Sequence, residues 1–110
     1  MPLPAEVDVA SVSTMLEQGE SFYFLDCREL DEYETAAIPG ATLLPMSELQ
    51  ERLEELQPYR DSRIVIHCHH GGRSLQVANY LRRIGFENAQ SMAGGIDQWS
   101  EQIDPSIPRY

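Results

Sequence analysis

The chain has 110 residues, of which 42% are hydrophobic and 24% are charged, and its 18 acidic residues outnumber its 8 basic residues to give a formal net charge of −10. This length is typical of one domain with a single core, and the negative charge opposes binding to nucleic-acid phosphates or anionic lipids. Every basic residue is arginine, which excludes catalysis by a lysine Schiff base. We therefore expect one domain over residues 1–110 that binds neither nucleic acid nor membranes.

Neither the N-terminus nor the cysteine content indicates export. Residues 1–6 contain no basic or apolar stretch of the kind found in secretory signals and transit peptides, and no window approaches the roughly 20 apolar residues of a membrane span. Cys27 and Cys68 are too few for a disulfide framework and lack zinc-site spacing. We expect a cytoplasmic protein with reduced thiols.

The first part of the chain contains one predicted helix and one predicted strand. The helix begins near Asp8 and ends at Gly19. Its inward face is predicted to consist of Val12, Met15 and Leu16. The run 21–26 is apolar and aromatic, follows the glycine and ends on a charge, which is typical of a buried strand.

A second helix is predicted to begin at Ser47. Residues 47–50 have the pattern of a capping box. Leu49, Leu53 and Leu56 then recur on one face with charged residues between them, which predicts an amphipathic helix lying on a sheet.

The second half of the chain repeats the order of strand and helix. The run 63–68 is β-branched and is predicted to be a strand. A helix follows from Arg73, with an apolar residue at every third position: Leu75, Ala78, Leu81 and Ile84. Gly85 ends this helix, and Phe86 is placed to close a Schellman motif against Leu81.

The last predicted helix begins after Gly94-Gly95, with Ile96 and Trp99 facing inward, and only the tail 103–108 is irregular. Strands that alternate with helices of this length predict a mostly parallel sheet covered on both faces. The fold class is therefore α/β, in three α/β/α layers.

Cys68 lies where a thiol nucleophile is expected. Reactive groups of open parallel sheets gather at the carboxyl ends of the strands, and Cys68 ends a predicted strand directly before a helix. Gly71 and Gly72 permit a tight turn whose N–H groups point inward, and the helix N-terminus adds positive potential. We expect these groups, with Arg73, to hold the pKa of Cys68 well below that of a free thiol.

The spacing between Cys68 and Arg73 constrains the chemistry. The pattern is Cys-x-x-x-x-Arg, one residue shorter than the loop of tyrosine-type phosphatases. Such a loop is too narrow for a tetrahedral phosphate beyond the thiolate but is wide enough for one extra sulfur. A Cys68 persulfide would be an anion stabilised by the loop N–H groups, as in an oxyanion hole.

Three motifs in register resemble the rhodanese family. The first signature is matched by residues 25–29, 32–33 and 38–41, the active-site loop by residues 68–74 and the closing motif by residues 94–99. The resemblance covers roughly residues 6–100 and implies a sheet of about five strands. The chain departs from the family at Ala36-Ala37, where Gly-His is usual, and at Cys27, where an apolar residue is usual.

The resemblance implies two-step transfer of sulfane sulfur by a thiosulfate:cyanide-type sulfurtransferase. Cys68 would take sulfur from a donor such as thiosulfate or a persulfide and pass it to cyanide, a thiol or a protein acceptor, without a cofactor. The backbone of residues 69–73, including Gly71 and Gly72, would cradle the outer sulfur. Four side chains have expected roles: Arg73 in attracting the anion and bracing the loop, Ser74 in capping the helix, and His69 and His70 in contacting the donor.

Other polar residues near the strand ends are expected to be structural. Asp26, Arg28 and Glu32 are predicted to form a buried ion-pair network that braces the loop, and His67 is predicted to pack beneath the loop. We expect no metal site, because adjacent histidines such as His69 and His70 rarely direct both rings at one ion and no third ligand is evident.

Several alternatives stay open. The domain is also consistent with a sulfur-relay or partner-docking module that turns over few small molecules, and less so with a phosphatase-like anion-binding enzyme. Cys27 either replaces a valine or acts as a resolving thiol for Cys68. The sequence does not identify the sulfur donor or acceptor; we expect a monomer.

Overall fold

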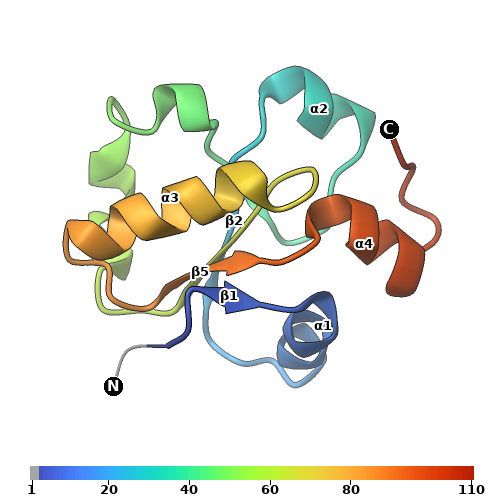
Figure 1. Ribbon diagram of the computed structural model, residues 1–110, viewed down its shortest axis with the longest axis horizontal. Coiled ribbons are helices and arrows are strands. Elements are labelled where there is room, and N and C mark those ends of the chain that lie inside the picture. Colours follow the sequence, from blue (N-terminus) through green and yellow to red (C-terminus); the bar gives the residue numbers. More distant parts are fainter. Residues whose placement is uncertain (1–2) are drawn as a thin grey trace.

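A five-stranded parallel sheet organises the protein (Figure 1). The computed structural model describes residues 3–110, so Met1 and Pro2 of the N-terminal segment considered above lie outside the described residues. The strands are β1 (Glu6–Val7), β2 (Tyr23–Asp26), β3 (Thr42–Leu43), β4 (Ile64–His67) and β5 (Ala89–Met92), in the spatial order β1-β5-β4-β2-β3. The α-helices are α1 (Val9–Glu17), α2 (Leu30–Thr35), α3 (Gly72–Arg83) and α4 (Gly95–Gln102), and two 3₁₀ segments are η1 (Met46–Glu48) and η2 (Leu53–Tyr59).

Alternating residues of the central strands contribute their side chains to two hydrophobic cores, one on each face of the sheet. Leu25 and Ile66 pack with Leu81 of α3 on one face. Phe24 and Val65 pack on the other face with side chains of α1 and α4, which lie together on one side of the sheet (Figure 1). Because both faces are covered, the predicted three-layer α/β architecture is confirmed.

The predicted first helix is confirmed as α1, with one error on its inner face. The Asp8 carboxylate accepts a hydrogen bond from the N–H of Ser11 at 2.8 Å, which caps the helix. Val12 and Met15 are buried as expected, but Leu16 is 38% exposed. Val9 is buried in its place, because the apolar stripe runs along positions three residues apart, which places Leu16 at its margin.

Helix α3 ends in the predicted Schellman motif. Gly85 adopts a φ of 104°, and the N–H of Phe86 donates to the carbonyl of Leu81 at 2.9 Å. The side chains of Leu81 and Phe86 are both fully buried in the same core. The chain therefore turns sharply toward β5 at this point.

The α-helix predicted to begin at Ser47 is wrong. The segment forms η1 and η2 instead, and the Ser47 hydroxyl donates to the Glu29 carboxylate at 2.7 Å rather than capping a helix. Leucines three residues apart, such as Leu53 and Leu56, share a face in a 3₁₀ helix as well as in an α-helix. Pro58 lies within η2, where it supplies no N–H for an α-helical hydrogen bond.

The sequence analysis did not locate three of the strands or α2. Strands β1 and β3 have only two residues each, and β5 is completely buried although Ala-Gln-Ser-Met lacks β-branched residues. The tail is irregular as expected, but its Ile107 is buried in the second core. Among residues 3–110, no helix combines the length and apolar character needed to cross a membrane.

A pair of identical substitutions tests the assigned core. Leu81→Ala is expected to lower the free energy of unfolding by about 2–5 kcal/mol, because it leaves a cavity between α3 and the sheet. Leu16→Ala, at the exposed position on α1, is expected to cost less than about 1 kcal/mol. Urea denaturation followed by circular dichroism measures both, and equal losses would contradict the described packing.

Candidate active site

Cys68 follows β4 and begins the loop that leads into α3. Its side chain is 1% exposed, and its Sγ accepts hydrogen bonds from the N–H groups of Gly71 at 3.1 Å and Ser74 at 3.3 Å. Gly71 has a φ of 110° at the N-cap of α3, a conformation that glycine adopts without strain. The tight turn therefore directs main-chain donors at the sulfur.

Ser74 and Ser91 extend this set of donors. The hydroxyl of Ser74 lies 3.4 Å from the Cys68 Sγ and 2.7 Å from the hydroxyl of Ser91, and all three side chains are buried. When Cys68 is ionised, its thiolate can only accept, so Ser74 donates to the sulfur and accepts from Ser91. Ser91, on β5, had no sequence signal because its neighbours in the chain carry no motif.

Helix α4 orients the loop through its first N–H groups. The N–H of Ile96 donates to the carbonyl of Cys68 at 2.9 Å, and the N–H of Asp97 donates to the carbonyl of His69 at 3.1 Å. In a trans peptide the carbonyl and the N–H point in opposite directions, so the N–H groups of His69 and His70 face away from α4. A Cβ at Gly95 would lie 2.4 Å from the His69 carbonyl oxygen, which explains the glycine in the closing motif.

The loop retains unused donors. Within the described part of the chain, the N–H groups of His69, His70, Gly72 and Arg73 donate to no main-chain carbonyl. Gly72 and Arg73 form the first turn of α3, where N–H groups have no partner inside the helix. The loop can therefore stabilise more negative charge than that of the thiolate alone.

Cys27 lies beside Cys68. Strands β2 and β4 pair with Asp26 opposite His67, so the next residues, Cys27 and Cys68, are neighbours on the same face of the sheet. The Cys27 thiol is 1% exposed and belongs to the same core.

The two thiols have opposite pKa shifts. A hydrogen bond from the Cys27 S–H, followed by the Ser74 hydroxyl and the N–H groups of Ser74 and Gly71, lowers the pKa of Cys68 to about 4 against the opposing effect of burial. Donation to Cys68, together with burial, raises the pKa of Cys27. Cys68 is thus the thiolate, and Cys27 holds its proton.

Arg73 is held by Glu32. Its guanidinium makes a bidentate ion pair with the Glu32 carboxylate at 2.6 and 2.8 Å, which is the main reason that the pKa of Glu32 falls to about 2. The Tyr110 hydroxyl donates to the same carboxylate at 2.8 Å. The structure therefore joins the end of the active-site loop to α2 and to the C-terminal tail.

Asp26 and Arg28 form a fully buried ion pair next to the loop. Arg28 donates to both carboxylate oxygens of Asp26 at 2.9 and 2.7 Å. Its remaining donors reach the carbonyls of Ala36 and Glu32 and the hydroxyl of Tyr110. Ala36, which replaces a usual glycine, thus serves through its carbonyl while its methyl group packs in the second core. Such complete pairing is what a buried guanidinium requires.

His67 lies beneath the loop. It is fully buried against the ring of Phe24, with its Nε2 at 3.7 Å from Asp26. Burial lowers the pKa of His67, so the imidazole is neutral at pH 7.

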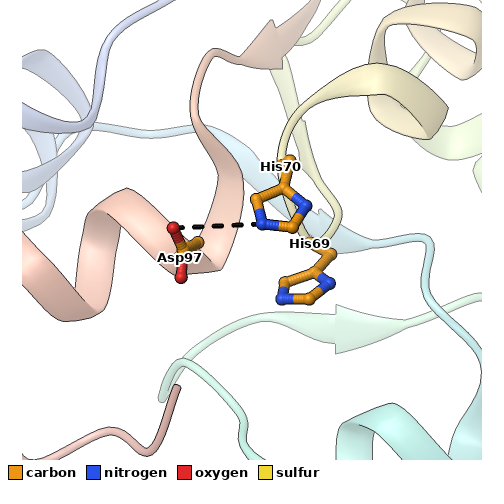
Figure 2. Close-up of side chains that lie close together, drawn as sticks. All are labelled: His69, His70 and Asp97. Carbon is orange, nitrogen blue, oxygen red and sulfur yellow. Dashed lines mark ion pairs between the residues drawn. The ribbon is translucent and has the colours of Figure 1, made fainter. Parts of the chain in front are cut away.

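His69 and His70 form the rim of the site with two residues that the sequence did not indicate. Figure 2 shows His70 facing Asp97 of α4, with Nε2 and a carboxylate oxygen 3.9 Å apart. The His69 ring is stacked between the rings of His70 and Tyr110, at centroid distances of 3.8 and 3.9 Å. Asp97 and Tyr110 lie far from the loop in sequence, and only the fold brings them to it.

The rim also supplies a third potential metal ligand, contrary to the sequence analysis. Ligand atoms of His69, His70 and Asp97 all lie within 4.8 Å of one another. However, the two histidine rings are stacked at 27°, so their in-plane lone pairs run side by side instead of meeting at one point. Asp97 is also engaged by Arg109 at 2.9 and 3.2 Å. This geometry suits a pocket rim better than a metal centre.

Comparisons with known proteins agree with the loop motif. A model of the family described as rhodanese-like domain matches residues 8–102. The chain is 35% identical over 102 residues to a sulfurtransferase of Allochromatium vinosum, covering 93% of this chain and 94% of that protein. The structure of human single-domain sulfurtransferase TSTD1 has a TM-score of 0.80 and 26% identity, covering 91% of this chain and 98% of that one.

Other relatives are much longer. The rhodanese-like/PpiC domain-containing protein 12, chloroplastic, of Arabidopsis thaliana is 38% identical over 90 residues, covering 78% of this chain and 29% of that protein. The chain spans 22% to 52% of the length of five further curated relatives.

Removing the Cys27 donor is expected to raise the pKa of Cys68. In the wild type the thiolate is expected to disappear only as the pH falls through about 4, whereas in Cys27→Val the transition moves to higher pH because one donor is lost. Titration of the ultraviolet thiolate absorbance measures both. Cys27→Ser, which keeps a hydroxyl donor, is expected to shift less, and coincident wild-type and valine titrations would disprove the contact.

Removing the Asp26 charge is expected to destabilise the protein. Asp26→Asn leaves the buried Arg28 guanidinium uncompensated, which costs about 3–5 kcal/mol. Asp31→Asn makes the same change at an exposed position and is expected to cost less than about 1 kcal/mol. Urea denaturation at pH 7 compares them, and a small loss in Asp26→Asn would refute the bracing role of the pair.

Proposed function

Because this chain belongs to the rhodanese-like domain family, we propose that it is a sulfurtransferase that carries sulfane sulfur as a persulfide on Cys68. The observation that carries the proposal is the buried Cys68 side chain, whose Sγ accepts two main-chain N–H groups in a loop that contains four further N–H groups without a main-chain acceptor. This arrangement supplies both an activated nucleophile and a cradle for an added anionic sulfur.

The first step loads sulfur onto the enzyme. The Cys68 thiolate attacks the sulfane sulfur of a donor such as thiosulfate, a new S–S bond forms, and the original S–S bond breaks. Sulfite leaves with the bonding electron pair. Since the pKa of Cys68 is lowered to about 4, the attacking thiol is already ionised at neutral pH.

The second step transfers the outer sulfur of the Cys68 persulfide to an acceptor. The outer sulfur carries the negative charge of the persulfide, and the N–H groups of His69, His70, Gly72 and Arg73 are the available donors to it. Cyanide or a thiol attacks this outer sulfur, and the S–S bond to Cys68 breaks. Cys68 leaves as a thiolate, and its low pKa makes it a good leaving group.

Side chains around the loop have supporting roles in this proposal. Arg73, held by Glu32 at 2.6 Å, keeps its positive charge beside the loop and braces the loop against α2. Ser74 donates its hydroxyl to the thiolate and its N–H to the same sulfur. His69 and His70 contact the donor at the rim. The acceptor class is a thiol, either small or on a protein, and cyanide serves as a laboratory substitute.

The length of the loop separates sulfur transfer from phosphatase activity. Six residues from Cys68 to Arg73 close the ring, and the first turn of α3 packs Ser74 directly against Sγ. One added sulfur needs only the unused N–H groups, whereas a phosphate needs room for four oxygens. We therefore propose no turnover of phosphate esters.

Sulfur loading gives a direct test. After incubation with thiosulfate and removal of excess donor, the intact mass is expected to rise by about 32 Da, the mass of one sulfur atom. Cyanide is then expected to remove the increment and yield thiocyanate. Cys68→Ala should show neither signal, while Ser106→Ala, at an exposed position of the tail, should keep both.

The contrary results are equally clear. If the wild type takes up no sulfur from thiosulfate or from a low-molecular-weight persulfide, or if Cys68→Ala still takes it up, the proposal fails. Hydrolysis of an aryl phosphate that depends on Cys68 would favour the phosphatase alternative instead.

A further inference from the structure

Cys27 is a buried thiol that donates to Cys68 but takes no part in the bond changes of the proposed transfer cycle. Its side chain is 1% exposed, and both it and Cys68 lie in the core between the sheet and α3. Cys68 is equally buried, so what separates the two thiols is that Cys68 accepts the loop N–H groups. Within the described residues, the thiol beside it is that of Cys68.

The strand register brings the two cysteines within disulfide range. Asp26 pairs with His67, and the Cys27 N–H donates to the carbonyl of His67 at 3.1 Å, which continues the β2–β4 ladder by one residue. Neighbouring strands lie about 4.8 Å apart, and disulfides join Cα atoms about 4.4–6.8 Å apart. Because both side chains project from the same face, an S–S bond needs only side-chain rotation.

The surroundings of the Cys68 sulfur are divided into two sides. Cys27 lies beside it at the end of the neighbouring strand, whereas the donors that would hold an outer sulfur belong to the loop and to the first turn of α3. Displacement at the inner sulfur requires the attacking thiol to approach opposite the outer sulfur. Cys27 comes from the end of β2 and not from the loop that would hold the outer sulfur, which is compatible with that approach.

We propose that Cys27 is a resolving thiol that attacks the inner sulfur of the Cys68 persulfide and releases the outer sulfur as hydrosulfide. The inference rests on the proposed function, because it begins from the loaded enzyme. The Cys27–Cys68 bond forms, the bond from Cys68 to the outer sulfur breaks, and the leaving sulfur takes the electron pair and the proton of the Cys27 thiol.

The step needs no external oxidant. The sulfane sulfur is reduced to sulfide while the two cysteines are oxidised to a disulfide, so atoms and electrons balance. A dithiol, or two equivalents of a small thiol, must then reduce the disulfide before the next cycle. The loop N–H groups that stabilise the outer sulfur of the persulfide also stabilise it as it departs.

The outer sulfur of the persulfide can leave Cys68 by either of two nucleophilic attacks. An external acceptor attacks the outer sulfur and receives it, whereas Cys27 attacks the inner sulfur and discards the outer one. When an acceptor is scarce, the protein releases sulfide and closes its own nucleophile in a disulfide, which protects Cys68 from further oxidation.

An anaerobic chase tests this step. The full chain is loaded with thiosulfate, freed of donor, held without acceptor or reductant, and quenched with acid and a thiol-alkylating reagent at intervals. The wild type is expected to lose the increment of about 32 Da and gain a species about 2 Da lighter than the reduced protein, with one sulfide released per disulfide. Peptide mapping should join Cys27 to Cys68.

Two matched variants identify the thiol responsible. Cys27→Val preserves the apolar packing, and Cys27→Ser preserves the size and a donor, but neither can form the disulfide. Both are expected to load sulfur and release sulfite, more slowly than the wild type because a donor to the Cys68 thiolate is lost or changed, and then to keep the persulfide with sulfide release slowed about tenfold or more. Thermal unfolding verifies that each variant is folded.

The results separate this inference from the proposed function. If the wild type releases no sulfite and takes up no sulfur, the sulfurtransferase proposal itself fails. If the wild type loads sulfur but keeps its persulfide as long as Cys27→Val does, or releases sulfide without a Cys27–Cys68 disulfide, only the resolving role is overturned. The wild-type time course decides the matter even if both variants misfold.

Discussion

The parallel pairing of β2 with β4 is the constraint on which the site depends. Asp26 lies opposite His67, so the two strands end together and release their next residues at one edge of the sheet. Side chains alternate along a strand, and this alternation sends Cys27 and Cys68 into the core under α3 while Asp26 and His67 face the other layer. The register of β2 against β4 thus places the two thiols on one face of the sheet and the Asp26 carboxylate, which pairs with Arg28, on the other.

The buried charges on the two faces of the sheet are stabilised by different kinds of group. On one face, Arg28 is buried with its donors engaged by Asp26, two carbonyls and Tyr110, so the pair is a rigid support. On the other face, the thiolate of Cys68 is held by neutral donors: two N–H groups, the Ser74 hydroxyl and the Cys27 thiol. A negative charge held by neutral groups can move outward to a second sulfur without breaking an ion pair, which suits a site that exchanges an anionic atom.

The loop is held from three directions that are distant in sequence. Helix α4 binds the carbonyls of Cys68 and His69, α2 binds Arg73 through Glu32, and the tail stacks Tyr110 on His69. The end of the chain accordingly lies beside α2 in Figure 1. These supports fix the peptide orientations that keep the loop N–H groups available, so the reactivity of one cysteine depends on most of the fold.

Local sequence was sufficient for the features that arise from neighbouring residues. The Schellman end of α3, the start of α1 near Asp8, the two central strands and the cysteine loop each depend on a few consecutive side chains and on backbone conformations that glycine permits. The α/β class followed from the alternation of these elements. Where two conformations bury the same leucines, as in η1 and η2, the apolar pattern alone could not distinguish them, and the predicted helix at Ser47 was wrong.

The tertiary structure alone decided which groups meet Cys68. Strand order placed Ser91 against Ser74, strand register placed Cys27 against Cys68, and the return of the tail placed Tyr110 on His69. None of these pairs has a local signature, because each joins segments whose contact depends on packing of the whole sheet. The sequence by itself predicted a thiol of lowered pKa at the start of a glycine-containing loop between a strand and a helix. The fold determined that the Cys27 thiol lies beside Cys68 and keeps its proton, and that α4, α2 and the tail support the loop. Contacts between such distant segments are set by the core that they bury together.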